Sequence, residues 1–310
     1  MRLHQVDFEA VTQGRRLNEL DEACQKWGFF ELVNHPISEA LCLEMLEAMA
    51  HFFSLPKERK QACERTELNH WGFYDRELTK NVQDWKELYD VGPERGHCVP
   101  QWPTAEASFR SATERFYSAS EATALALVGS IAQALGETPD VLLSGFEEHS
   151  SYLRLNYYPL CDNPAPASTA TGEQQGHLGI SHHSDAGAVT ILLQDGQPGL
   201  QVERGGEWHD ISASRGAILV NIGDVVQVWS NDRYVAPVHR VLASQDRLRY
   251  SAPFFLNPSF EASYAPVASV TQGEAPLYRA IPWREFREGR ARGDYADYGH
   301  EVQISDYRIP

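Results

Sequence analysis

The residues best suited to chemistry lie between Gly176 and Asp195, in the segment GHLGISHHSDAGAVTILLQD. His183 and Asp185 are two positions apart within it, and residues two apart on a β-strand point to the same side. The β-branched and apolar residues that flank this pair favour a strand. An imidazole and a carboxylate on one strand face form a candidate metal-binding pair, although a triplet this short also occurs as an ordinary surface pair.

A third candidate ligand, His239, follows 56 residues after His183. This separation is long enough for one or two hairpins to bring the chain back beside the first strand. Two neutral imidazoles and one carboxylate are typical of mononuclear iron(II) oxygenases, in which further coordination positions stay open for the reaction. Zinc accepts similar ligands, so the ligand types alone leave both metals open.

Arg249 and Ser251 form the next feature, ten residues beyond His239, in the strand-like run RYSAPFFLNP. They share one strand face, and a guanidinium beside a hydroxyl suits a carboxylate. An iron-bound 2-oxo acid with a second carboxylate needs such an anchor. An ordinary strand arginine in a surface ion pair is the alternative when this motif is taken alone.

Together these motifs resemble the 2-oxoglutarate and Fe(II)-dependent dioxygenases of the isopenicillin N synthase-like, plant-type branch. The segments LRLNYYPL at Leu153 to Leu160 and VNIGDVVQVWSN at Val220 to Asn231 belong to the same resemblance. It extends over nearly the whole chain, because the N-terminal half contains four further matching segments: QVDF at 5–8, WGFFELVNHPI at 27–37, FFSLPKERK at 52–60 and DRELTKNVQDWKELYD at 75–90.

The resemblance implies the cofactors and a reaction. Fe(II), 2-oxoglutarate as cosubstrate and O2 are expected, with oxidative decarboxylation of 2-oxoglutarate coupled to oxidation of a substrate C–H bond. The outcome for the substrate is hydroxylation, desaturation or cyclisation. The implied metal ligands and catalytic residues are His183, Asp185 and His239, and the implied 2-oxoglutarate contacts are Arg249, Ser251, Asn156 and Tyr158.

The substrate is expected to be a small organic molecule of moderate size, such as a secondary metabolite or an amino-acid derivative. Phe255 has the strand phase of Arg249 and Ser251, and the resemblance places an aromatic residue near the substrate at this position. Trp71, Tyr74 and Trp85 lie in a segment rich in amphipathic aromatics, which suits a pocket wall or lid. For each of these aromatic residues, packing within the protein is the alternative.

The elements that must position these residues are short strands with turn signals between them, which indicate an all-β sandwich or barrel. The resemblance implies a mainly β fold with flanking helices: a distorted double-stranded β-helix, or jelly roll, with an α/β N-terminal extension. Four regions are expected, namely an extension at 1–100, a scaffold helix region at 101–145, the Fe(II)/2-oxoglutarate jelly-roll core at 146–265, and a C-terminal helix and tail at 266–310.

Individual elements can also be predicted. Ser38 is expected to cap a helix, and the apolar period predicts one long scaffold helix from Thr104 to Leu135. A charged helix is expected from Trp283 to Arg292. The loop from Asp162 to Gln175 and the C-terminal tail are candidates to cover the site, which the sequence does not decide.

Composition restricts the class of protein. The 310 residues are 42% hydrophobic, enough for a large core. The formal net charge of −16 repels nucleic acid and anionic membranes, so neither is expected as a partner. No stretch has the apolar length of a signal peptide or membrane span, and five scattered cysteines favour a reducing cytoplasm. Oligomeric state is not predicted.

Three alternative functions compete with the oxygenase. An iron-dependent oxidase of the same fold does without 2-oxoglutarate; Arg249 and Ser251 argue against it, although an arginine there also suits another carboxylate. A zinc hydrolase requires a general base near the three ligands, and no convincing one is seen. A jelly-roll binding protein that keeps the motifs as structure is disfavoured because all three ligands are intact.

Overall fold

The computed structural model describes residues 3–79, 82–169, 175–212, 214–292, 299 and 301–310. In this part of the chain the largest element is a sheet of eight strands. Its order across the sheet is β1 (His4–Asp7), β2 (Phe29–Val33), β12 (Ile218–Ile222), β9 (Val189–Gln194), β14 (Arg249–Leu256), β7 (Tyr152–Tyr158), β6 (Glu87–Val91) and β3 (Gly72–Tyr74).

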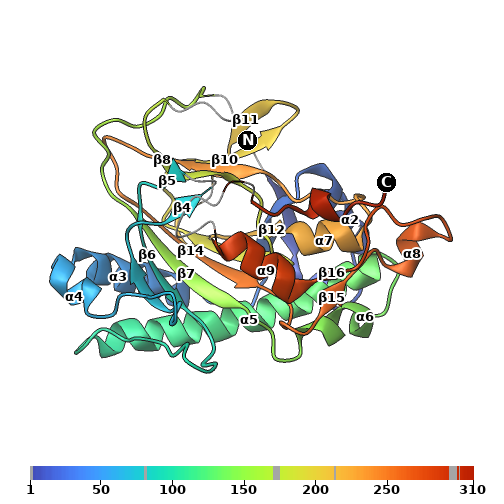
Figure 1. Cartoon of the computed structure of the whole chain (residues 1–310), viewed down its shortest axis with the longest axis horizontal. Helices are drawn as coiled ribbons and strands as arrows, with labels where there is room; N and C mark the ends of the chain where they lie inside the picture. Colours follow the sequence, from blue (N-terminus) through green and yellow to red (C-terminus); the bar gives the residue numbers. More distant parts are fainter. Residues whose placement is uncertain (1–2, 80–81, 170–174, 213, 293–298, 300) are drawn as a thin grey trace.

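A second sheet of four strands lies across from the central part of the first (Figure 1). The turn between two of its strands is Gly205-Gly206, and both glycines have positive φ, which suits a two-residue hairpin. The two facing sheets confirm the expected jelly-roll core. The order of the smaller sheet is β11 (Glu207–Asp210), β10 (Leu200–Arg204), β13 (His239–Leu242) and β8 (Leu178–His183).

The N-terminal extension builds both edges of the large sheet. At one edge β2 pairs antiparallel with β12, and at the other β6 pairs antiparallel with β7. Residues before position 100 therefore continue the core sheet by backbone hydrogen bonds. A short hairpin of the extension, β4 (Leu78–Thr79) and β5 (Val82–Gln83), pairs separately and packs near β8.

Helices cover the outer face of the large sheet, and the long helix α5 (Ala107–Ala134) runs along it (Figure 1). It begins three residues later than the sequence predicts, after Ala105 with φ of 65°. Ser38 caps α3 (Glu39–Ser54) as expected, because its hydroxyl accepts a hydrogen bond from the Leu41 amide. The other helices on this part of the chain are α1 (Phe8–Thr12), α2 (Leu17–Lys26), α4 (Lys57–Gln61) and α6 (Pro139–Leu143), with the 3₁₀ turn η1 (Ser144–Phe146).

The C-terminal region forms the helix α9 (Trp283–Arg292), whose bounds are those expected from the sequence. Trp283 anchors it, since its indole is fully buried and donates to the Ser150 hydroxyl at 2.7 Å. The remaining elements are α7 (Asp224–Trp229), β15 (Ser263–Tyr264), α8 (Ala268–Thr271), β16 (Ile281–Pro282) and η2 (Ile304–Tyr307).

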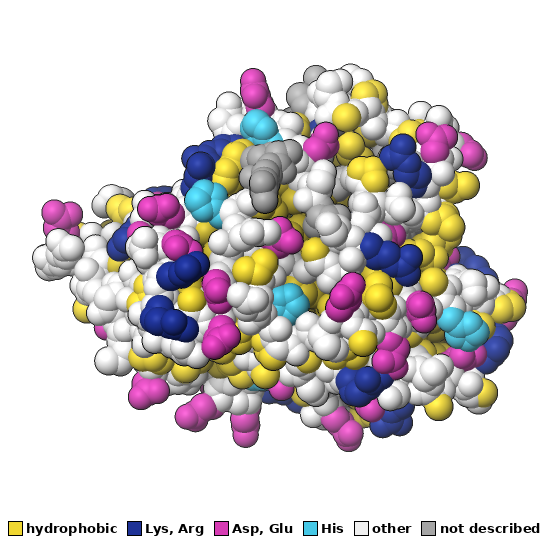
Figure 2. Space-filling view, turned by 180° about the vertical axis from the view of Figure 1, so that it is seen from behind, with side chains coloured by type: hydrophobic (Ala, Val, Ile, Leu, Met, Phe, Trp, Pro, Cys, Tyr) yellow, Lys and Arg dark blue, Asp and Glu magenta, His cyan; other side chains and the backbone are white. Residues whose placement is uncertain are grey.

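Charged side chains of both signs are spread over one face of the molecule. On the face in Figure 2, acidic side chains are dispersed and basic side chains lie between them. The acidic side chains on that face are therefore explained as ordinary solvent-exposed polar groups.

Candidate active site

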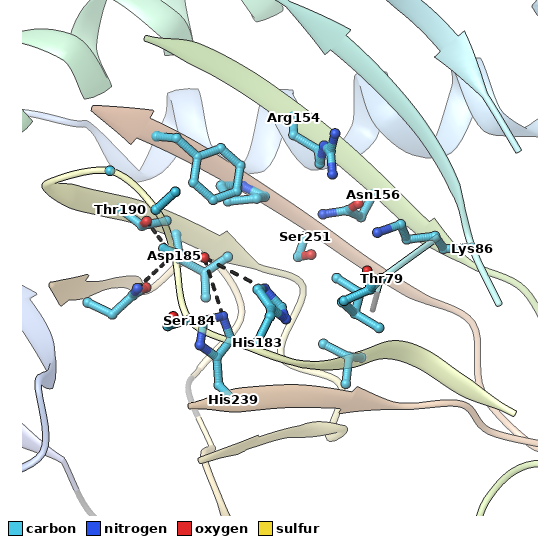
Figure 3. A pocket seen from close by; sticks show the side chains of 18 of the residues that line it. Thr79, Lys86, Arg154, Asn156, His183, Ser184, Asp185, Thr190, His239 and Ser251 are labelled. Carbon is cyan, nitrogen blue, oxygen red and sulfur yellow. Dashed lines mark hydrogen bonds and ion pairs between the residues drawn. The ribbon is translucent and has the colours of Figure 1, made fainter. Parts of the chain in front are cut away.

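Two strands of the smaller sheet bring the two histidines together. His183 at the end of β8 is the register partner of His239 at the start of β13. The Nε2 atoms of the two rings lie 3.6 and 3.7 Å from Oδ1 of Asp185. The candidate ligand atoms of these three residues all lie within 4.8 Å of one another, a spacing that one metal ion can span (Figure 3).

Asp185 corrects one detail of the sequence prediction. Strand β8 ends at His183, so Asp185 lies in the following loop and not on the strand itself. The loop is held from the other side, because the Asp224 amide donates to the Asp185 carbonyl at 2.8 Å and the Val225 amide to the Gly187 carbonyl at 3.1 Å. These bonds to the start of α7 replace the sheet pairing that would have extended the strand.

The groups around the ligands prepare them for a metal. His183 Nδ1 lies 2.8 Å from the Ser181 carbonyl and His239 Nδ1 lies 3.0 Å from the Pro237 carbonyl, so each ring has Nε2 free for a metal. Oδ2 of Asp185 accepts hydrogen bonds from Thr190 Oγ1 at 2.5 Å and Asn221 Nδ2 at 2.6 Å, which leaves Oδ1 available.

The charge states match this role. Burial lowers the pKa of His183 well below its ordinary value, and His239 beside it adds to the effect. Burial alone would raise the pKa of Asp185, but the two histidines and the hydrogen bonds from Thr190 and Asn221 outweigh it, so this pKa is lowered. Neutral imidazole and ionised carboxylate are the forms that bind a metal ion.

A polar row beside the ligands crosses three strands of the large sheet. Ser251 on β14 pairs with Asn156 on β7 and with Gln194 on β9, and Arg249 pairs with Tyr158. The Tyr158 hydroxyl lies 3.4 Å from Ser251 Oγ. The structure thus brings together in one cavity all four residues expected to contact 2-oxoglutarate (Figure 3 labels Asn156 and Ser251).

Two members of this row have polar atoms without a partner. Arg249 is 4% exposed, and its Nη2 donates to Gln194, but its Nε and Nη1 have no hydrogen-bond acceptor among the described residues. The Oδ1 atom of Asn156 is also unpartnered in that part of the chain. The two unpaired donors of Arg249 suit a carboxylate ligand, because leaving buried donors unpaired is costly.

A second row, of aromatic side chains, leads to the metal ligands. Phe255 on β14 pairs with Tyr152 on β7 and with Thr190 on β9, the residue that donates to Asp185. The Tyr152 and Phe255 rings lie 4.9 Å apart. Both line the cavity, so Phe255 lies where a substrate contact requires it, and Tyr152 has the strand phase of Asn156 but is not among the residues expected at the substrate.

The other three aromatic residues expected at the substrate lie elsewhere. The Trp85 ring lies 4.8 Å from that of His177 and donates to the Leu160 carbonyl, and Tyr74 lies under the guanidinium groups of two arginines. Neither is among the described residues that line the metal cavity. Trp71 lines a neighbouring cavity instead, where its ring lies 6.0 Å from that of Tyr152.

Buried charges form a wall of the cavity that the sequence does not predict. Arg154 on β7 and Lys86 line the cavity and share the carboxylate of Glu77, at 2.8 and 2.7 Å. Lys86 also binds Asp84, and Oδ1 of Asp84 accepts from the Ser181 amide on β8. Strand alternation from Asn156 points to Arg154, but no local pattern marks Lys86, because its position in the cavity depends on distant segments.

The two candidate lids differ. Arg290 on α9 and Glu301 in the tail line the cavity, so the C-terminal region borders the site. In the loop from 162 to 175, residues 170–174 lie outside the described part. Arg240 donates to the carbonyls of Ala167 and Thr169, which fastens the described part of this loop to β13.

A jelly roll with a His-Asp-His set and a buried arginine in one cavity is the arrangement typical of non-haem iron oxygenases. Comparison with known families agrees: residues 149–258 match the 2OG-Fe(II) oxygenase superfamily. Residues 4–105 match a family described as non-haem dioxygenase in morphine synthesis N-terminal. The chain belongs to the 2-oxoglutarate and Fe(II)-dependent oxygenases of the plant type, as its motifs predict.

Individual relatives cover most of the chain. It is 33% identical over 296 residues to oxoglutarate-dependent flavonoid 7-O-demethylase 1 of Ocimum basilicum, which covers 93% of this chain and 75% of that protein. The structure of JOX2 in complex with 2OG, Fe and JA has a TM-score of 0.85 at 26% identity, covering 100% and 90% of the two chains. A full-length Neurospora crassa protein in complex with alpha-KG and thymine has a TM-score of 0.78 at 25% identity, covering 91% and 94%.

The fold, the enzyme class and the cofactors Fe(II) and 2-oxoglutarate predicted from the sequence are confirmed by these relatives. The oxidase that dispenses with 2-oxoglutarate is accordingly the weaker interpretation. Among the described residues, no helix combines the length and apolar character needed to cross a membrane.

Proposed function

We propose that this 2-oxoglutarate-dependent Fe(II) dioxygenase oxidises a C–H bond of a small organic molecule that binds against Tyr152 and Phe255. The observation that carries the proposal is the aromatic row itself. It ends at Thr190, which donates to Asp185, so a molecule on the two rings lies beside the metal ligands.

The donor set fits the iron that the family requires. His183, His239 and Asp185 would hold Fe(II), which with 2-oxoglutarate and O2 supplies the oxidising power for C–H cleavage. Thr190 and Asn221 fix the Asp185 carboxylate, and the two backbone carbonyls fix the imidazole tautomers. These contacts orient the ligands before any substrate binds.

The polar row fits the cosubstrate. The unpartnered Nε and Nη1 of Arg249 would bind the far carboxylate of 2-oxoglutarate, with Ser251 and Tyr158 beside them. Asn156, 1% exposed, would orient the bound acid from the next strand.

Relatives support a small-molecule substrate. JOX2 was solved with JA and the Neurospora crassa protein with thymine, and the Ocimum basilicum relative is a flavonoid demethylase. Hydroxylation, desaturation and cyclisation all remain within the proposal, because each begins with removal of one hydrogen atom from carbon.

Substrate-dependent succinate release tests this proposal. A panel of aromatic and alicyclic metabolites is incubated with the Fe(II) enzyme, 2-oxoglutarate and air, and succinate and oxidised product are measured together. We expect at least one compound to raise succinate release with a matching product. Phe255→Ala should raise KM for that compound about tenfold or more, while Tyr74→Ala, outside the cavity, should not. No substrate-dependent succinate across the panel would contradict the proposal.

A further inference from the structure

Among the described residues, five cationic side chains of lysine and arginine line the metal cavity, and four of them have an assigned partner or role. Arg249 is the proposed anchor for 2-oxoglutarate. Lys86 and Arg154 both bind buried carboxylates of the N-terminal extension. Arg290 binds Glu301 at 2.8 Å. The fifth cation is Arg287.

Arg287 differs from the others in its surroundings. It is half-buried on α9, and no acidic side chain of the described chain lies within ion-pair distance of it. Its guanidinium carbon lies 5.8 Å from the Tyr152 ring centroid. An arginine that is held inside a cavity without a counter-charge favours binding of an anion there.

The position of Arg287 joins two cavities. Arg287, Tyr152 and Arg154 line both the metal cavity and the neighbouring one, which also contains Trp71. Tyr152 and Phe255 thus lie between the metal ligands and the Arg287 guanidinium. A molecule in this space meets aromatic surface near the iron and a cation at its far end.

We propose that Arg287 binds a carboxylate of the substrate, so that the enzyme acts on monocarboxylic acids with an aromatic or alicyclic body. This inference rests on the proposed function and names its substrate class. The apolar body would pack on Tyr152 and Phe255, which presents a C–H bond to the metal, and the carboxylate would pair with Arg287.

The geometry separates this carboxylate from the cosubstrate. Arg249 and Phe255 are six residues apart on β14, which corresponds to about 20 Å along a strand. The two cations therefore serve opposite ends of the cavity.

Matched acids and neutral analogues test the inference. Arylalkanoic and alicyclic monocarboxylic acids, each with its methyl ester and primary amide, are titrated anaerobically into the enzyme loaded with Fe(II) and 2-oxoglutarate. Calorimetry reports binding without turnover. We expect the best acid to bind at least about tenfold more tightly than its ester and amide, as an arginine–carboxylate pair should provide. Arg287→Gln should abolish that preference, and Arg287→Lys should retain part of it.

Arg284→Gln is the matched control, because Arg284 lies on the same helix, is half-exposed and pairs with Glu261. It should leave the acid preference unchanged. Equal binding of acids and esters, failure of every acid to bind, or an acid preference that survives in Arg287→Gln would each overturn the inference. 2-Oxoglutarate affinity, measured in the same samples, should be unchanged in Arg287→Gln. If wild type does not bind 2-oxoglutarate, the proposed function fails instead.

Discussion

At the scale of single residues, the carboxylate of Asp185 is held by two hydrogen-bond donors from neighbouring strands. Thr190 on β9 and Asn221 on β12 both donate to its Oδ2. Since Oδ2 is occupied in this way, Oδ1 faces the two histidine rings. The two donors therefore set the orientation in which Asp185 meets a metal ion.

Removal of the Thr190 hydroxyl should weaken metal binding. Thr190→Val keeps the shape of the side chain but leaves Oδ2 of Asp185 with one donor fewer, so we expect the affinity for Fe(II) to fall about 10- to 100-fold. A competition titration against a chelator measures it. Thr123→Val is the control, since that buried hydroxyl donates to the Ala119 carbonyl within α5. Equal Fe(II) affinities of Thr190→Val and wild type would contradict the role assigned to the Thr190 hydroxyl in holding the Asp185 carboxylate.

The metal ligands themselves can be predicted from the sequence, whereas these supports cannot. Ligand types and spacing identify His183, Asp185 and His239 as candidates, and the family resemblance implies the same three residues. The role of Thr190 depends on sheet register, which one sequence does not state. Arg287 lies on helix α9, and its place in the cavity depends on how that helix packs against distant segments, which one sequence does not state either.

At the scale of elements, the loop that contains Asp185 depends on its contact with the start of α7, and this contact requires a glycine. A Cβ on Gly223 would lie 2.3 Å from the Gly187 carbonyl oxygen and 2.7 Å from that of Asp185. Because φ of Gly223 is −114°, the cost comes from this close approach and not from backbone strain. We expect Gly223→Ala to lower the free energy of unfolding by about 1–3 kcal/mol and to weaken metal binding.

Denaturant unfolding and metal titration of Gly223→Ala measure both effects. Gly145→Ala is the control, because its Cβ would meet only an ordinary contact, the Ala262 Cβ at 4.0 Å. A Gly223→Ala protein with the metal affinity and stability of wild type would show that the loop does not depend on α7.

Most strands and helices are predictable because their apolar periods are strong. The bounds of α9 are those that the sequence predicts, and Ser38 caps α3. The segment from 69 to 84 has no clean period, so its short strands are not predictable. Two aromatic residues expected at the substrate, Tyr74 and Trp85, instead pack against other parts of the protein.

At the scale of the whole molecule, a buried ion network ties the N-terminal extension to the jelly roll. Glu77 from the extension binds Arg154 of β7, Lys86 and Arg65, all within 3.2 Å. Burial opposes ionisation of Glu77, but these three cations outweigh it and hold its pKa below the ordinary value of 4.5. The sequence predicts the jelly roll and the extension but not this junction, because its charges are distant along the chain.

The network should make stability depend on pH. A carboxylate with a depressed pKa stabilises the fold above its unfolded pKa and loses that contribution as pH falls toward the folded pKa. We expect Glu77→Gln to cost about 3–5 kcal/mol near pH 7, since it leaves buried cations unpaired. Below about pH 4.5 the difference from wild type should shrink by up to about 1.4 kcal/mol per pH unit.

Urea unfolding of wild type and Glu77→Gln from about pH 7 to about pH 3.5 checks this expectation. Glu114→Gln is the control, because Glu114 forms an exposed pair with Arg110 and should change stability by less than about 1 kcal/mol. A stability difference for Glu77→Gln that stays constant over the whole pH range would contradict the assigned charge state.

Anaerobic titration of the Fe(II)-loaded protein with 2-oxoglutarate tests the central claim most directly, that one cavity holds the metal and the cosubstrate. The weak visible charge-transfer band of the complex is followed in wild type, Asp185→Ala and Arg249→Gln. The site predicts a band in wild type, none in Asp185→Ala, and a band in Arg249→Gln that needs far more 2-oxoglutarate. No band in wild type despite bound iron, or an unchanged titration in Arg249→Gln, would contradict it.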